Sequence, residues 1–140
     1  GNIIFFDGDA SDYIYSGTET ITQGTWSADG SSSEVHISVT PSASTQGLWW
    51  DLYFDSSMLT NSTLMDQVYQ NAERWPFESP GHPGLDVSGD GRGCDTVTGQ
   101  FQIQDVQWSS GGSLTSFTAT FEHHCEGGAA ALRGCVHYGQ

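Results

Sequence analysis

The chain has 140 residues, of which 17 are acidic and only 3 are basic, and its formal net charge at pH 7 is −14. Such a surface repels polyanions, which excludes nucleic acid and anionic membrane as partners and favours cations. Aromatic residues make up 12% of the chain, whereas a disordered acidic tail would lack them. The length fits one domain over residues 1–140 with a core of its own, and no apolar run is long enough to span a membrane.

The three cysteines, Cys94, Cys125 and Cys135, are typical of an oxidising compartment, with one disulfide and one thiol left over. The chain begins at Gly1 rather than Met, and no basic segment precedes an apolar leader. We therefore expect a mature, secreted extracellular protein.

Apolar and polar residues alternate with a period of two between turn clusters, and no segment shows a clear helical stripe. This pattern predicts an all-β fold, an antiparallel β-sandwich of the jelly-roll kind. The expected strands, in chain order, are Ile3–Phe6, Tyr13–Tyr15, Thr18–Trp26, Glu34–Thr40, Leu48–Phe54, Gln100–Trp108, Leu114–Cys125 and Leu132–Tyr138. The one candidate for a short helix is Met65–Arg74.

Alternation also sorts strand residues into an inner and an outer face. The expected inner residues are Val35, Ile37 and Val39 in one strand, Leu48, Trp50, Leu52 and Phe54 in the next, and Phe117, Ala119, Phe121, His123 and Cys125 in a third. Between Ile103 and Val106 the apolar positions change parity, which predicts a β-bulge near Gln104–Asp105.

Trp49 and Tyr53 fall on the outer face of their strand beside Asp51 and Asp55. Exposed aromatic rings stack on sugar rings while carboxylates accept hydrogen bonds from hydroxyls, so these residues are candidates for polysaccharide binding. A loop or another subunit covering the two rings is the alternative.

The mature N-terminus is apolar at four consecutive positions, Ile3, Ile4, Phe5 and Phe6. A strand of this kind buries both faces, either inside its own sandwich or by donation to a neighbouring subunit. We expect these residues, with the leftover thiol of Cys135, to take part in assembly.

A Gly-rich segment carries oxygen-bearing side chains at alternate positions, Asp86, Ser88 and Asp90, followed by Gly91. The spacing is similar to the first half of a calcium loop, in which several oxygens surround a hard cation. Position twelve is Val97 instead of the usual Glu, so Asp95 or Glu126 is the candidate to complete the site. An ordinary polar turn without an ion is the competing interpretation.

The sequence contains no Gly-x-Ser-x-Gly elbow and no His-Glu-x-x-His motif, and we predict that the protein is not an enzyme. His123 and His124 face opposite sides of a strand, which argues against a shared zinc ion. Asn61-Ser62-Thr63 fits the glycosylation pattern, which makes Asn61 a candidate modification site.

Three segments carry a resemblance to a family of secreted bacterial β-rich domains of unassigned activity. They are residues 74–80 (RWPFESP), 83–94 (PGLDVSGDGRGC) and 121–127 (FEHHCEG). The resemblance implies a β-rich extracellular module in which Cys94 pairs with Cys125. Cys125 also has the inner parity of its strand, while pairing of Cys125 with Cys135 across a hairpin is the alternative arrangement.

Together these features predict a non-enzymatic extracellular structural protein, a self-assembling subunit of a fibre or surface layer that calcium stabilises. The partners would then be further copies of the chain, as a homo-oligomer or polymer. The alternative function is a carbohydrate-binding module that uses Trp49 and Tyr53.

Overall fold

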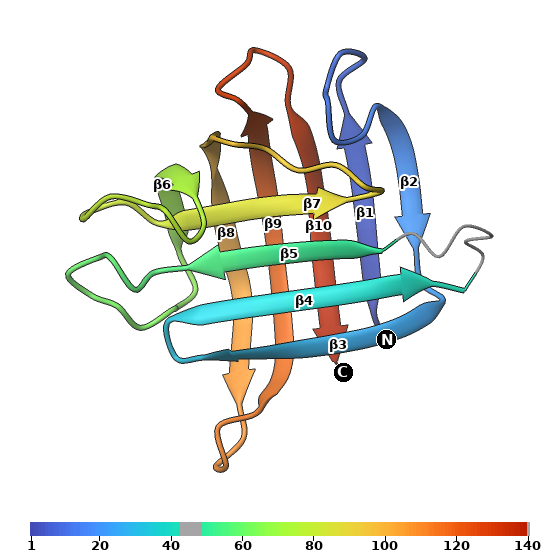
Figure 1. The fold of residues 1–140 in the computed structure, drawn as a ribbon. Coiled ribbons are helices and arrows are strands. Elements are labelled where there is room, and N and C mark those ends of the chain that lie inside the picture. Colours follow the sequence, from blue (N-terminus) through green and yellow to red (C-terminus); the bar gives the residue numbers. More distant parts are fainter. Residues whose placement is uncertain (43–48, 140) are drawn as a thin grey trace.

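A computed structural model describes residues 1–42 and 49–139, which form ten strands (Figure 1). The strands are β1 (Ile3–Gly8), β2 (Gly17–Ile21), β3 (Gly24–Ser31), β4 (Glu34–Pro41), β5 (Trp50–Asp55), β6 (Val68–Arg74), β7 (Gly84–Gly89), β8 (Val97–Trp108), β9 (Leu114–Cys125) and β10 (Leu132–Gly139). No helix occurs in the described ranges, so the predicted all-β fold class is confirmed.

All ten strands belong to one sheet with the order β2-β1-β10-β9-β8-β6-β7-β5-β4-β3. The pairs are antiparallel except β6 with β7, which pair in parallel over two residue pairs. The sheet folds back on itself, so β3, β4, β5 and β7 run across β1, β10, β9 and β8 in a second layer (Figure 1). The two layers enclose the core, and β2 and β3 are the edges of the sheet.

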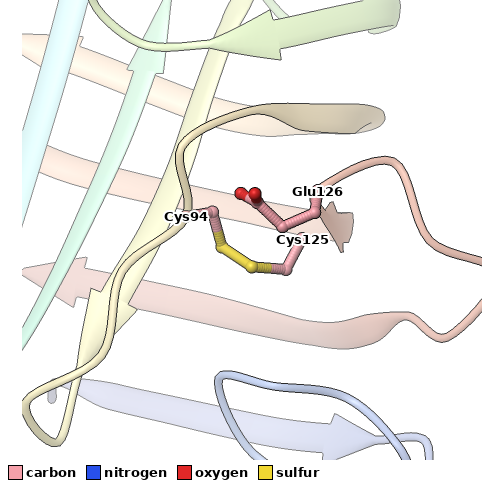
Figure 2. A group of neighbouring side chains, drawn as sticks. All are labelled: Cys94, Cys125 and Glu126. Carbon is pink, nitrogen blue, oxygen red and sulfur yellow. A yellow bond between two sulfur atoms is a disulfide. The ribbon is translucent and has the colours of Figure 1, made fainter.

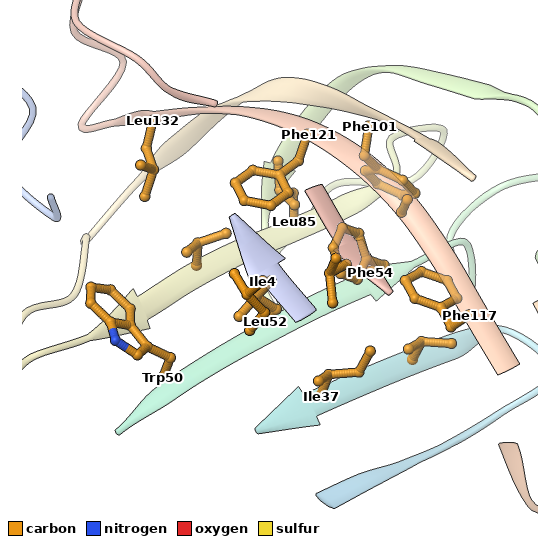
Figure 3. Packing of buried hydrophobic residues seen from close by; sticks show 14 of the residues in the cluster. Ile4, Ile37, Trp50, Leu52, Phe54, Leu85, Phe101, Phe117, Phe121 and Leu132 are labelled. Carbon is orange, nitrogen blue, oxygen red and sulfur yellow. The ribbon is translucent and has the colours of Figure 1, made fainter. Parts of the chain in front are cut away.

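The core contains the inward residues that alternation predicted. Val35, Ile37 and Val39 are buried in β4, and Trp50, Leu52 and Phe54 in β5. Leu48 was expected on the same face but lies outside the described residues. The Phe54 ring packs on Phe101 and Phe117 of the opposite layer, at centroid distances of 5.3 and 5.1 Å (Figure 3).

The prediction of a short helix over Met65–Arg74 is wrong, because this segment contains strand β6. β6 pairs with β8 on one side and β7 on the other. Its register shifts between Tyr69 and Ala72, where Asn71 adopts a left-handed conformation with φ 58°. The extra residues interrupt the period of two, which is why the sequence pattern did not indicate a strand.

Two other predicted elements also differ. Tyr13–Tyr15 is not a strand, because the Asp12 carboxylate accepts hydrogen bonds from the backbone N–H groups of Ile14 and Tyr15 and holds a turn. The expected strand Thr18–Trp26 is two strands, and its halves lie on opposite edges of the sheet. By contrast, the predicted bulge in β8 is confirmed between Ile103 and Asp105.

The N-terminal strand β1 pairs with β10 on one side and β2 on the other, both in its own chain. Ile4 and Phe6 are fully buried, whereas Ile3 and Phe5 are half-buried on the outer face. The expectation that this strand buries both faces therefore holds for one face only. Within the described residues no helix has the length and apolar character that crossing a membrane requires.

Candidate functional site

A hollow of about 400 Å³ lies across the outer faces of β6, β8, β9 and β10. We call it the amide groove. Its lining residues are Val68, Gln70, Gln100, Phe101, Gln102, Thr120, Phe121, Glu122, Arg133 and Gly134. Three of its six polar side chains are amides, those of Gln70, Gln100 and Gln102.

Strand register places the polar side chains in two rows across the sheet. Gln100 pairs with Glu122, which pairs in turn with Arg133. The next row joins Gln102 to Thr120. Because side chains of one parity share a face, residues from four strands meet on one surface.

Small and buried residues form the floor of the groove. The rings of Phe101 and Phe121 are only 1% and 4% exposed, since their side chains point into the core. Gly134 pairs with the buried residues Phe121 and Phe6, so a Cβ there would point into the core, 2.8 Å from Cζ of Phe121. No aromatic ring is offered for stacking, so the groove can bind a ligand mainly through hydrogen bonds.

One end of the groove is charged. The Arg133 guanidinium donates to Oε1 of Glu122 and Oδ1 of Asp9, both at 3.2 Å. His124 Nε2 lies 2.8 Å from the second Glu122 oxygen, and its Nδ1 lies 2.8 Å from the Gly128 carbonyl oxygen. The hydrogen bond between His124 and Glu122 raises the pKa of His124. The same hydrogen bond, with the nearby positive charge of Arg133, lowers the pKa of Glu122. These charges compensate one another locally.

The three glutamines in the groove, Gln70, Gln100 and Gln102, are exposed. In the described part of the chain their amides make no hydrogen bond to protein. Each amide offers two N–H donors and one carbonyl acceptor, so the groove presents both kinds of group to a ligand. These residues were not predicted as a site from the sequence, although glutamine at alternate positions of β8 was a visible signal.

Tyr53, one of the two predicted sugar-binding residues, is the middle ring of a three-ring stack. Its ring lies 4.1 Å from His36 and 3.7 Å from Trp75, with interplanar angles of 6° and 8°. Two nearly parallel rings at these distances must cover opposite faces of Tyr53, so in this conformation it has no face for a sugar ring. The alternative interpretation, in which a loop covers the ring, is the one that applies to Tyr53, because Trp75 lies in the loop after β6.

Trp49, the other predicted sugar-binding residue, is 47% exposed immediately before β5. Its carbonyl oxygen accepts a hydrogen bond from the backbone N–H of Asp90, which ties it to the turn after β7. Trp49 thus keeps an exposed aromatic surface but lies apart from the residues that line the amide groove.

The predicted calcium ligands are distributed between a strand and a turn. Asp86 and Ser88 lie in β7, whereas Asp90 and Asp95 follow it. An extended strand rises about 3.3 Å per residue, which separates Asp86 from Asp90 by about 13 Å. In the described residues, the carboxylates of Asp86, Asp90 and Asp95 do not bring three ligand atoms within 4.8 Å of one another.

Asp86 has a buried neighbour. Its Oδ1 lies 3.7 Å from Nε2 of His123, and His123 is 0% exposed. Both imidazole nitrogens and Asp86 Oδ1 lack a hydrogen-bond partner in the structure. The buried His123 confirms the inner parity expected for it, and half-buried His124 points the other way.

Cys94 and Cys125 form the predicted disulfide, with their Cα atoms 5.4 Å apart (Figure 2). Cys135 is the free thiol. With Glu126 these two cysteines bring three potential ligand atoms close together. The sulfurs are bonded to each other, however, and Glu126 Oε1 accepts hydrogen bonds from the backbone N–H groups of Asp95 and Thr96. The cluster therefore has a structural role: the disulfide and the Glu126 hydrogen bonds fix the segment before β8 to the end of β9.

Asn61, the candidate glycosylation site, is exposed between β5 and β6. Its Oδ1 accepts a hydrogen bond from the backbone N–H of Thr63 at 3.3 Å. Its Nδ2, the atom that glycosylation would modify, lies 3.5 Å from Sδ of Met65, and modification of Asn61 stays a prediction.

No protein-family model matches the chain, and neither a curated protein nor a solved structure is significantly similar to it. The resemblance to secreted bacterial β-rich domains stays a prediction from three short segments.

Proposed function

We propose that the protein is a non-catalytic carbohydrate-binding module and that the amide groove binds a neutral glycan. The observation that carries this proposal is the set of three exposed, unpartnered glutamine amides in one hollow of about 400 Å³. Sugar hydroxyls both donate and accept hydrogen bonds, and amide groups complement both roles. A hollow of this volume falls in the range of small-ligand sites.

Charge favours a neutral glycan over an acidic one. The net charge of −14 repels polyuronates and sulfated chains. Arg133 could attract an anion, but Glu122 and Asp9 already pair with it. The groove therefore offers hydrogen bonds without an uncompensated positive charge.

Calorimetric titration with neutral oligosaccharides of cellulose, xylan and mannan tests the proposal, with oligogalacturonate as the acidic comparison. We expect one neutral series to bind. Replacing both Gln100 and Gln102 by Ala should weaken that binding about tenfold or more, because each lost hydrogen bond contributes about 0.5–1.5 kcal/mol.

Gln107→Ala is the matched control, since Gln107 is exposed on the same strand but outside the groove. It should bind like the parent. If Trp49→Ala abolishes binding while the double glutamine variant binds normally, the sugar site is at Trp49 and the groove proposal is wrong.

Self-assembly into a fibre or layer is the second candidate function. The specific observation that favours it is on the outer face of β1 and β10, where Phe5 and Cys135 are cross-strand neighbours and both are half-buried. β1 already has strand partners on both sides, so assembly would use this face rather than donation of the N-terminal strand.

Sedimentation and non-reducing mass spectrometry under oxidising conditions test the assembly candidate. A Cys135–Cys135 linked dimer that Cys135→Ser abolishes would support it. A monomer at every concentration, with and without calcium, would remove it from consideration.

A further inference from the structure

The segment between β6 and β7, residues 75–83, folds back over the end of β4 and β5. We call it the Glu78 loop. Trp75 Nε1 donates to Oε1 of Glu34 at 2.7 Å. The backbone N–H of Gly81 donates to the Met58 carbonyl at 2.8 Å. The loop is thus fixed by contacts to two other parts of the chain.

The loop places a carboxyl group in a slot of the sheet. Glu78 is only 8% exposed, and its Oε2 is buried without a hydrogen-bond partner. A Cβ at Gly84 would lie 1.6 Å from that oxygen and 3.2 Å from Cβ of Asp55. Gly84 therefore creates the space that the Glu78 carboxyl fills, directly beside Asp55.

The charged groups that face Glu78 are acidic. They come from three strands: Asp55 from β5, Glu34 from β4 and Glu73 from β6. Glu34 and Asp55 are cross-strand neighbours. Arg74, the nearest arginine in sequence, has its guanidinium over the Phe77 ring, and no salt bridge joins Glu78 to a cationic side chain in the described residues.

A carboxylate buried among other carboxylates is unfavourable, whereas a neutral carboxylic acid fits the same slot. We propose that Glu78 is a proton-operated latch: protonated Glu78 holds the loop docked, and its ionisation releases the loop and exposes the carboxyl of Asp55. The latch is independent of glycan binding, because none of these residues lines the amide groove.

The direction of the pH effect follows from burial and, secondly, from repulsion by Asp55, which raise the pKa of Glu78 from 4.5 to about 7. A group whose pKa is raised in the docked state favours docking fully at acid pH and loses that contribution as pH rises. The equilibrium constant for docking of the loop should fall by up to about tenfold per pH unit between pH 4.5 and about 7, and it should level off above the higher value.

Amide hydrogen exchange measured by NMR from about pH 5 to about 8, corrected for intrinsic rates, tests the latch. The reporters are the amides of Gly81 and Ser79, which bond Met58 and Glu73. We expect their protection in the parent to fall about tenfold or more over this range. In Glu78→Gln, a neutral mimic of the protonated acid, protection should stay high.

Two further variants make the test decisive. Gly84→Ala fills the slot, so its reporter amides should be poorly protected at every pH. Glu19→Gln, a change at an exposed residue of β2, should keep the parent profile. Equal pH dependence in the parent and Glu78→Gln, or a parent-like profile in Gly84→Ala, would overturn the proposal.

Discussion

At the residue scale, two glycines act by leaving space for a neighbouring side chain. Gly84 accommodates the carboxyl of Glu78, and Gly134 accommodates the ring of Phe121. Neither glycine has a positive φ, so the backbone does not require glycine there. Packing requires it, because any Cβ would collide with an atom of another segment.

Gly134→Ala should destabilise the fold by about 1–3 kcal/mol, the usual cost of overpacking. The added Cβ would lie 2.1 Å from the Phe5 carbonyl oxygen, and backbone of a paired strand cannot move aside freely. Urea unfolding followed by tryptophan fluorescence measures the change in the free energy of unfolding.

Gly93→Ala is the matched control, since a Cβ at Gly93 meets nothing within 4 Å. It should leave the free energy of unfolding nearly unchanged. Equal stability of the two variants would show that β1 and β10 can separate to accept the methyl group.

At the element scale, β7 changes the interpretation of the Gly-rich segment. The sequence indicated a metal loop from Asp86 onwards, but residues 84–89 form a strand between β5 and β6. The polypeptide turns only at Asp90 and Gly91, which have φ values of 54° and 74°. A calcium ion bound here would therefore use the turn after β7 rather than the strand.

We expect added calcium to raise the melting temperature and a chelator to lower it, because Asp90 lies in this turn and Asp95 in the segment between the turn and β8 of an acidic protein. Asp90→Asn should abolish the calcium-dependent rise, whereas Asp86→Asn should retain it. Differential scanning calorimetry with calcium, with magnesium and with chelator measures both effects. Melting that is indifferent to all three additions would refute calcium binding.

The Cys94–Cys125 disulfide links this turn region to the C-terminal end of β9 across 31 residues of sequence. In the loop-entropy description, such a link stabilises the fold by about 3–4 kcal/mol. It also fixes the segment before β8, whose backbone N–H groups at Asp95 and Thr96 bond Glu126.

At the scale of the whole molecule, one continuous sheet supplies both layers of the core, and its outer faces carry different chemistry. The outer face of β6, β8, β9 and β10 holds the amide groove. The outer face of β4 and β5 holds the stacked rings and, under the Glu78 loop, the buried carboxyl of Asp55 beside half-buried Glu34. The division keeps the neutral, hydrogen-bonding surface apart from the acidic one.

The amino-acid sequence by itself determined the features that depend on local alternation. Val35, Ile37 and Val39 point inward because successive residues of a strand must face opposite sides, and the same rule located the bulge in β8. The disulfide between Cys94 and Cys125 was also anticipated, from the motif resemblance and the inner parity of Cys125.

Only the tertiary structure decided which outer faces meet. Gln70 and Arg133 are 63 positions apart in the printed sequence, and strand order alone brings them to one groove. Likewise, one face of Tyr53 is covered by His36 of the neighbouring strand and the other by Trp75 from a loop distant in sequence. Alternation fixes the side of a strand that a residue occupies, but strand pairing and loop docking are long-range events, and these determine whether that side is open, covered or part of a site.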